Sequence, residues 1–148
     1  MRKLIRIVPI VAMACILNSV AIAHEHATGI VKERMDVMEE IGRRMKSINT
    51  RMKMKRDVGA INEDAKAIAE RAAHIVHLFP PGSMQPPTDA RSSIWKNWSD
   101  FERLAKALET ESAKLAETSS GDIPALTTQV RAVSRVCNDC HEPYRLKR

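Results

Sequence analysis

Residues 122–145 read DIPALTTQVRAVSRVCNDCHEPYR, a stretch that combines an amphipathic helix with a compact group of reactive side chains. Asp122 is a suitable N-cap, and Pro124 falls in the first turn, where the missing N–H of proline is harmless. Apolar residues then recur every three or four positions, which is the period of an α-helix with one buried face. On that face we expect Leu126, Val130, Val133, Cys137, Cys140 or His141, and Tyr144.

Three earlier segments of the chain show the same helical period. They run from about Thr28 to Met52, from about Val58 to Phe79, and from about Ile94 to Leu115. Prolines stop the second segment at Pro80-Pro81-Gly82, and a proline-rich loop continues to Asp89. Four amphipathic helices with short connections predict an all-α fold, an antiparallel four-helix bundle.

The N-terminus carries the features of an export signal. Three basic residues within the first six positions precede an apolar run that is short for a membrane span and ends in Ala21-Ile22-Ala23. We therefore expect a signal peptide over residues 1–23, cleaved after Ala23, and a periplasmic bundle over residues 24–148. A retained membrane anchor is the alternative. Lipid attachment at Cys15 is disfavoured, because the residues before it form a poor lipobox.

Composition argues against nucleic-acid binding and against catalysis. The formal net charge of +6 includes the three charges of the signal region, so the mature chain carries +3. The chain has only two Phe, two Trp and one Tyr, and no basic patch is interleaved with stacking residues, as single-strand binding requires. No nucleophile–base pair or carboxylate dyad stands out, so we do not expect an enzyme.

The sequence Cys137-Asn138-Asp139-Cys140-His141 is a CxxCH motif, the signature of covalent c-type haem attachment. Two thiols at this spacing can add to the two vinyl groups at a porphyrin edge, and the adjacent histidine can reach the iron. Cys137 and His141 are one helical turn apart and therefore share a face of the helix. We predict one covalently attached haem c, bound through Cys137 and Cys140, with His141 as an axial iron ligand.

A pair of cysteines at this spacing can also bind zinc or form a redox-active or structural disulfide. A zinc site needs a second group of Cys or His ligands at matching spacing, and no second CxxC pair exists in the chain. A thioredoxin-type CxxC opens a helix after a strand, whereas this motif lies near the end of a helix. A haem-free bundle with a structural Cys137–Cys140 disulfide remains the alternative for an exported protein.

Taken together, these features resemble the class II cytochromes c, the family of cytochrome c-prime and its low-spin relatives, in which CxxCH lies in the last helix of a four-helix bundle. Residues 137–145 read CxxCHxxYR, which is similar to the C-terminal signature of the family. Ile94-Trp95 followed by Phe101 resembles its aromatic stretch. The resemblance implies that Arg34 and Arg145 lie near the haem, although from the residues alone both could equally be solvated charges.

The second axial iron ligand, opposite His141, is also assigned from the family resemblance. The first helix contains several methionines, which usually serve as adaptable core filler. The resemblance to the low-spin branch implies that Met38, one turn after Arg34, is the second axial ligand, with Met35 as the next candidate. His/Met ligation would make the protein a one-electron carrier with a raised reduction potential. An open iron face would instead make it a nitric oxide or carbon monoxide binding protein.

The resemblance implies redox partner proteins and a possible homodimer through the first two helices. His74 and His77 have a spacing that could hold a metal, but they fall opposite the apolar stripe and are expected at the surface. His24-Glu25-His26 would begin the mature chain, where the terminal amine and His26 could chelate Cu(II).

Overall fold

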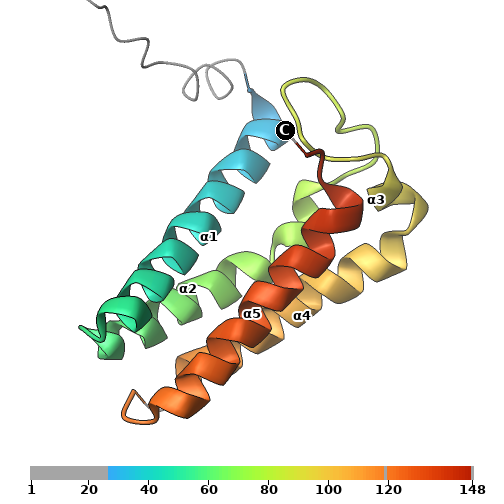
Figure 1. Cartoon of the computed structure of the whole chain (residues 1–148). Helices are drawn as coiled ribbons and strands as arrows, with labels where there is room; N and C mark the ends of the chain where they lie inside the picture. The colour runs from blue at the N-terminus through green and yellow to red at the C-terminus, as the bar shows by residue number, and fades with distance from the viewer. Residues whose placement is uncertain (1–26, 119, 148) are drawn as a thin grey trace, which may run out of the picture.

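The computed structural model describes residues 27–118 and 120–147 of the protein. Its four long helices form an antiparallel bundle (Figure 1), which confirms the predicted all-α architecture. The helices are α1 (Gly29–Met54), α2 (Ile61–Ala72), the single turn α3 (Ser93–Lys96), α4 (Trp98–Glu117) and α5 (Ile123–Tyr144), with 3₁₀ segments η1 (Val58–Ala60) and η2 (Ile75–Leu78). Among the described residues, the β-type pairing is limited to one antiparallel bridge between Ala90 and Arg145.

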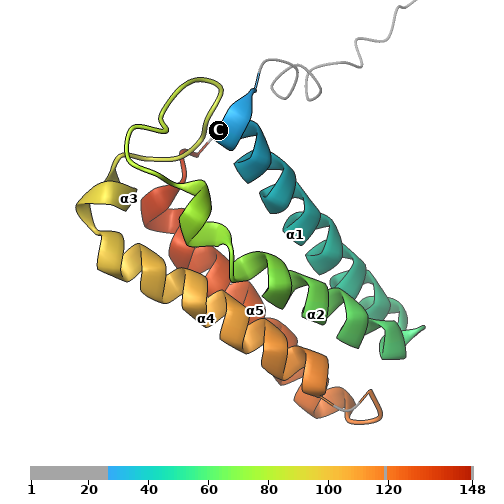
Figure 2. The ribbon, with the colours of Figure 1, turned by 180° about the vertical axis from the view of Figure 1, so that it is seen from behind.

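The bundle has a closed side, where α2 and α4 pack together, and an open side, between α1 and α5. Helices α2 and α4 pack closely and lie in front in Figure 2, whereas α1 and α5 lie in front in the opposite view of Figure 1. α1 packs mainly against α2, and α5 mainly against α4, while α1 and α5 make little direct contact. The start of α1 and the end of the chain lie close together in both views.

Apolar residues of all four long helices meet in one core, on the faces that the helical period predicts. The large side chains that are fully buried are Ile48, Ile61, Ile68, Ile94, Leu115, Leu126 and Val133. Met38, Met45 and Met52 of α1 are half-buried and pack against this core. Burial of each large aliphatic side chain contributes about 1.5–3 kcal/mol of hydrophobic free energy, so the core stabilises the association of the helices.

The ends of α1 and α5 are set by local chemistry. At the start of α5, the Asp122 carboxylate accepts a hydrogen bond from the backbone N–H of Ala125 (2.9 Å), which confirms the predicted N-cap. At the end of α1, Lys55 adopts a left-handed backbone conformation (φ 51°), and its N–H donates to the carbonyl of Arg51. This left-handed residue ends the helix and reverses the chain toward α2.

Two of the predicted helices are less continuous than the sequence pattern indicates. The helix expected over Val58–Phe79 is α-helical only from Ile61 to Ala72 and continues as the 3₁₀ segment η2. The carbonyl of Leu78, at the end of η2, accepts hydrogen bonds from the Arg34 guanidinium. The segment predicted to start at Ile94 is divided at Asn97, where the backbone leaves the helical region between α3 and α4 (φ −126°, ψ 46°).

No helix in the described part of the chain is long and apolar enough to cross a bilayer. The expected signal peptide, Cys15 and His24-Glu25-His26 lie outside the described residues.

Replacing Leu126 with alanine should lower the free energy of unfolding by about 3 kcal/mol, because the change opens a cavity in a core where Leu126 has no exposed surface. Urea unfolding followed by far-UV circular dichroism measures the change. Thr128→Ala, at an exposed position of the same helix, is the matched control and should alter stability by less than about 0.5 kcal/mol. Equal effects of the two substitutions would contradict the described packing of α5.

Candidate functional site

The CxxCH motif occupies the last turns of α5. Cys137 and Cys140 are half-buried, pack against the hydrophobic core, and are not joined by a disulfide. Burial raises the pKa of the Cys137 thiol, and burial together with the charges of Cys137 and Asp100 raises that of Cys140 to about 11. Both thiols are therefore protonated at neutral pH. No group of three or more potential His, Cys, Asp or Glu metal ligands occurs in the described residues.

His141 follows Cys140 directly and projects from an exposed position of α5. Partial burial of the ring lowers its pKa, and the positive charge of Arg145 acts in the same direction. The imidazole is therefore neutral at pH 7, with a nitrogen lone pair available to a metal. Two thiols and a neutral imidazole within five residues provide the donor groups that covalent haem requires.

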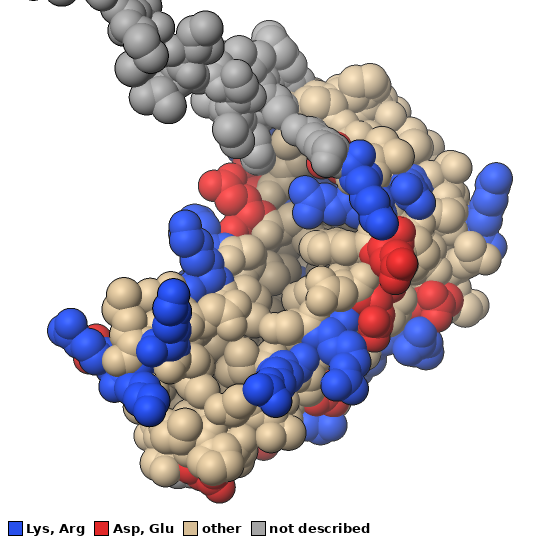
Figure 3. Space-filling model, viewed as in Figure 1, with Lys and Arg blue, Asp and Glu red and all other residues tan. Residues whose placement is uncertain are grey.

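The space for such a group lies on the open side of the bundle. Figure 3 shows a hollow in the surface between α1 and α5. Met38 and Met35 of α1 are both half-buried, and Met38 contacts the same core cluster as Cys137 and Cys140. The flanking helices thus bring two thiols from one side and a thioether from the other to the margins of one apolar region. The residues present fit a large planar apolar group with a metal at its centre.

Arg34 has a structural role that the sequence did not indicate. Its side chain is only 4% exposed. The guanidinium donates to the carbonyl of Leu78 (2.8 and 3.0 Å), the hydroxyl of Ser83 (2.6 Å) and the hydroxyl of Thr88 (3.2 Å). It also lies 4.0 Å from the centre of the Phe79 ring, within the range of a cation–π contact. Arg34 therefore binds α1 to the loop between η2 and α3.

The same loop holds the end of α5. The backbone N–H of Arg91 donates to the carbonyl of Tyr144 (2.9 Å), and that of Leu146 donates to the carbonyl of Asp89 (2.7 Å). Arg145 is exposed, and its guanidinium lies 3.7 Å from the Asp89 carboxylate. The two arginines that the family resemblance placed near the haem thus contact opposite parts of one loop. Their role toward haem stays a prediction.

Asp100 and Tyr144 form a second polar contact beside the motif. The Tyr144 ring is buried and packs edge-on against Phe101, with ring centres 5.5 Å apart. Its hydroxyl donates to the Asp100 carboxylate (2.8 Å), which also accepts from Arg103 (2.6 Å). The hydrogen bonds from Arg103 and Tyr144 lower the pKa of Asp100. Sequence analysis missed Asp100, and an acidic residue in the first turn of a helix was the available signal.

The remaining candidate residues lie away from this site. His74 and His77 are exposed, as expected, with ring centres 6.5 Å apart. They lie after the end of α2, not within it, because the α-helix stops at Ala72.

Known proteins similar to this chain agree with the arrangement. A family model described as cytochrome c′ matches residues 29–145. The chain is 29% identical over 122 residues to cytochrome c-556 of Agrobacterium tumefaciens (strain II Chrys), which covers 81% of this chain and 99% of that protein.

Two solved structures are similar in fold. One is a cytochrome c′ with an unusual ligand-controlled dimer dissociation (TM-score 0.73, 24% identity, 80% of this chain and 95% of that chain). The other is the nitric oxide complex of a mutant cytochrome c prime from Alcaligenes xylosoxidans (TM-score 0.71, 24% identity, 80% and 94% of the two chains).

Replacing Arg34 with alanine should lower the free energy of unfolding by about 3 kcal/mol, because the buried oxygens of Leu78 and Ser83 lose a charged donor. The loop between Phe79 and Ala90 should also become sensitive to limited proteolysis. Arg34→Lys keeps the charge but lacks the planar fork, so it should restore only part of the stability. Arg43→Ala, at an exposed site of α1, is the control. A protease-resistant loop in Arg34→Ala would contradict the assigned contacts.

Tyr144 is the only tyrosine of the chain, so ¹³C-labelled tyrosine reports its ionisation alone in a nuclear magnetic resonance titration. Burial, followed by the hydrogen bond to Asp100, raises its pKa from 10.0 to about 12. The unfolded chain releases this proton first as pH rises. The stabilisation is therefore complete below pH 10 and is lost between about pH 10 and 12. Asp100→Asn should move the pKa back toward 10, and an unchanged value would contradict the contact.

Proposed function

The chain belongs to the cytochrome c′ family and carries covalently attached haem c, and we propose that it is an exported one-electron carrier with His141 and Met38 as axial iron ligands. Members of this family are electron carriers or gas-binding proteins, so its function lies in redox or ligand chemistry at a single haem. When bound, the haem supplies a reversible one-electron change at iron.

The observation that carries the proposal is the pair of free, half-buried cysteines with His141 at the end of α5, one of the two helices that flank the hollow. Cys137 and Cys140 would hold the porphyrin edge covalently, and each would contribute a thiol that becomes a thioether. His141 would bind the iron from α5, since its imidazole is held neutral. All three residues lie on one regular helix, which fixes their relative positions.

Met38 supports the choice of electron transfer over gas binding. It lies on α1, across the hollow from α5, and is partly shielded from water. A thioether in the second axial position would exclude small ligands and raise the reduction potential relative to a second imidazole. With both axial positions filled, electron gain or loss would require little rearrangement of the surrounding side chains.

Gas binding is the second candidate function. It is favoured by the similarity in fold to a cytochrome c prime whose structure was solved with nitric oxide. In that case Met38 would pack over an open iron face without binding it, in keeping with the usual role of core methionines.

Export to the periplasm agrees with the predicted signal peptide, because c-type haem is attached outside the cytoplasm. Redox partner proteins would exchange electrons with the haem. A homodimer through α1 and α2 would agree with one protein of similar fold, which is a dimer whose dissociation is controlled by a ligand.

The visible spectrum of the haem-loaded protein tests the ligand assignment. We expect low-spin bands, a sulfur-to-iron charge-transfer band in the oxidised state, and no reaction of the reduced protein with carbon monoxide. Met38→Ala should abolish the charge-transfer band, give a high-spin haem and admit carbon monoxide. Met35→Ala, a half-buried methionine one turn earlier in α1, is the matched control and should keep the wild-type spectrum.

Other outcomes have definite meanings. A high-spin wild-type spectrum that changes with carbon monoxide would establish the gas-binding function in place of electron transfer. Loss of the charge-transfer band in Met35→Ala, but not in Met38→Ala, would transfer the ligand role to Met35. A colourless protein with an intact Cys137–Cys140 pair would refute haem attachment at this motif.

A further inference from the structure

Positive charge is concentrated in one segment of the chain. Residues 41–56 contain seven Lys or Arg and no Asp or Glu. The rest of the chain after residue 23 contains 14 basic and 18 acidic residues, so it is net negative. The segment forms the C-terminal half of α1 and the turn toward α2. The bundle is therefore electrically asymmetric although its total charge is small.

Within the described part of the chain, five of these seven residues form no ion pair with an acidic residue. Arg44 and Arg51 form ion pairs with Asp64, and Arg44 also pairs with Glu40, so these two arginines join α1 to α2. The other five are exposed, and the ion pairs of the described residues include none of them. We call these five the basic surface: Arg43, Lys46, Lys53, Lys55 and Arg56.

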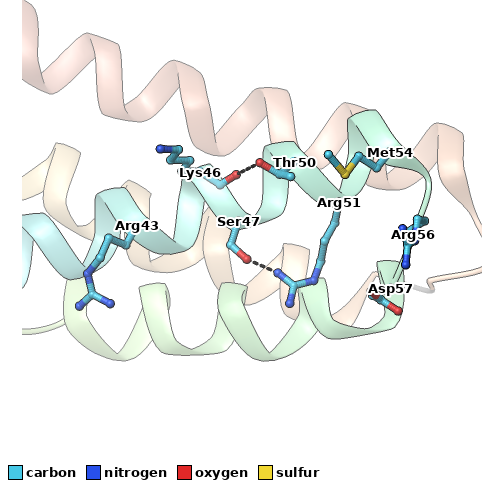
Figure 4. Close-up of a pocket in the computed structure, with 8 residues that line it drawn as sticks. All are labelled: Arg43, Lys46, Ser47, Thr50, Arg51, Met54, Arg56 and Asp57. Atoms are coloured by element: carbon cyan, nitrogen blue, oxygen red, sulfur yellow. Dashed lines mark hydrogen bonds between the residues drawn. The ribbon is translucent and has the colours of Figure 1, made fainter.

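The cations of the basic surface are spread along α1 and do not surround a single small binding site. Arg43, Lys46 and Arg56 line a pocket of about 400 Å³, in which Asp57 is the one acidic lining residue. Figure 4 shows Arg43 at one end of this pocket and Arg56 at the other, while Lys46 projects away from α2. At 1.5 Å per helical residue, the segment from Arg43 to Arg56 spans about 20 Å. That length suits a protein face better than a single small anion.

We propose that the basic surface is the docking site for an acidic redox partner protein. The inference rests on the proposed electron-carrier function. Arg43 and Lys46 lie about 8 and 12 Å beyond Met38 along the axis of α1, taking 1.5 Å per residue. Figure 3 shows basic side chains beside the hollow between α1 and α5. A partner held by this surface would therefore cover the margin of the haem site. Unpaired charges at such a surface accelerate encounter with a partner of opposite sign.

The same features disfavour other occupants. Residues 41–56 contain no aromatic side chain, so a nucleic acid would find no stacking platform. Met54 is the one large apolar side chain that the segment exposes among the described residues (62%), whereas insertion into a bilayer needs a continuous apolar face.

A second copy of this chain is a poorer match for the basic surface. An antiparallel dimer of α1 would place the basic surface against the acidic first half of the helix. There Asp36 pairs with Lys32, and Glu40 pairs with Arg44 and Arg71. Only Glu33 and Glu39 remain outside the ion pairs of the described residues, which cannot balance five free cations.

A gold electrode coated with a carboxylate-terminated alkanethiol monolayer serves as a defined acidic partner. Surface plasmon resonance measures adsorption of the haem-loaded protein, and cyclic voltammetry on the same surface measures electron transfer. The test variant is Arg43→Gln/Lys46→Gln/Lys53→Gln. The control, Lys66→Gln/Lys96→Gln/Lys147→Gln, removes the same charge from exposed lysines that the described ion pairs do not include. An amine-terminated monolayer gives the background.

We expect the test variant to adsorb about tenfold more weakly than the wild type and to lose the voltammetric current in parallel. The control should stay within about twofold of the wild type. Both effects should shrink as salt rises above 0.15 M, since exposed charges are then screened within about 8 Å. Equal losses in the two variants would overturn the proposal, because net charge and not this surface would then govern adsorption.

Further outcomes separate the proposal from its premise. Suppose that adsorption depends on the basic surface but gives no current, although hexaammineruthenium(II) still reduces the haem and hexaammineruthenium(III) still reoxidises it. That result would overturn redox docking and leave the electron-carrier function intact. Failure with hexaammineruthenium would overturn the electron-carrier function itself. Binding to vesicles of 70% phosphatidylcholine and 30% phosphatidylglycerol, without binding to the monolayer, would assign the surface to membranes. A sedimenting dimer that only the test variant dissociates would assign it to self-association.

Discussion

The buried guanidinium of Arg34 is the contact on which the geometry of the open side depends. It donates to the carbonyl of Leu78 and the hydroxyl of Ser83, and thereby fixes the loop that follows η2. A few residues later, that loop pairs with the end of α5 through the Ala90–Arg145 bridge. Since α1 and α5 make little direct contact, this chain of hydrogen bonds is the main polar link between them.

That link explains why an arginine is tolerated in the interior. A buried charge costs several kcal/mol unless its donors are satisfied, and here carbonyl and hydroxyl oxygens with an aromatic ring surround the guanidinium. Only arginine has a planar set of donors that can reach several oxygens at once. The arrangement holds two helices at a fixed separation while leaving the space between them open, which a directly packed helix pair cannot do.

Much of the fold follows from local sequence, because the period of apolar residues and the caps are local properties. The positions of α1, α4 and α5 agree with prediction to within a few residues, and Asp122 caps α5 as expected. The main failure is the end of the second helix. The helical pattern continues to Phe79, yet the α-helix stops at Ala72 and the chain continues as the 3₁₀ segment η2. The last carbonyl of η2, that of Leu78, accepts a hydrogen bond from a residue 44 positions earlier, and no window of sequence contains that contact.

Some residues of the candidate site could likewise be predicted from the sequence, and others could not. Cys137, Cys140 and His141 are recognisable because their chemistry requires fixed spacing within one helix. Asp100 was missed because its partner, Tyr144, is 44 residues away and the two meet only when α4 packs against α5. The family resemblance indicated Arg34, but its hydrogen-bond partners in the loop could not be predicted, because they meet it only in the folded chain. Residues that position a site are thus harder to predict than residues that perform its chemistry.

Helix α1 illustrates how one element can serve several purposes through its periodicity. Its core-facing row, which includes Ile41 and Ile48, is buried, and Met38 lies at the margin of this row. The row facing α2 contains Arg44 and Arg51, which both form ion pairs with Asp64. The cations of the outer face have no such partner among the described residues, and repulsion among them opposes folding slightly. The helix dipole favours cations in the last turn of α1, where Arg51 and Lys53 lie, but it does not account for Arg43 and Lys46, which precede that turn. A partner of opposite charge would account for the cations at these two positions.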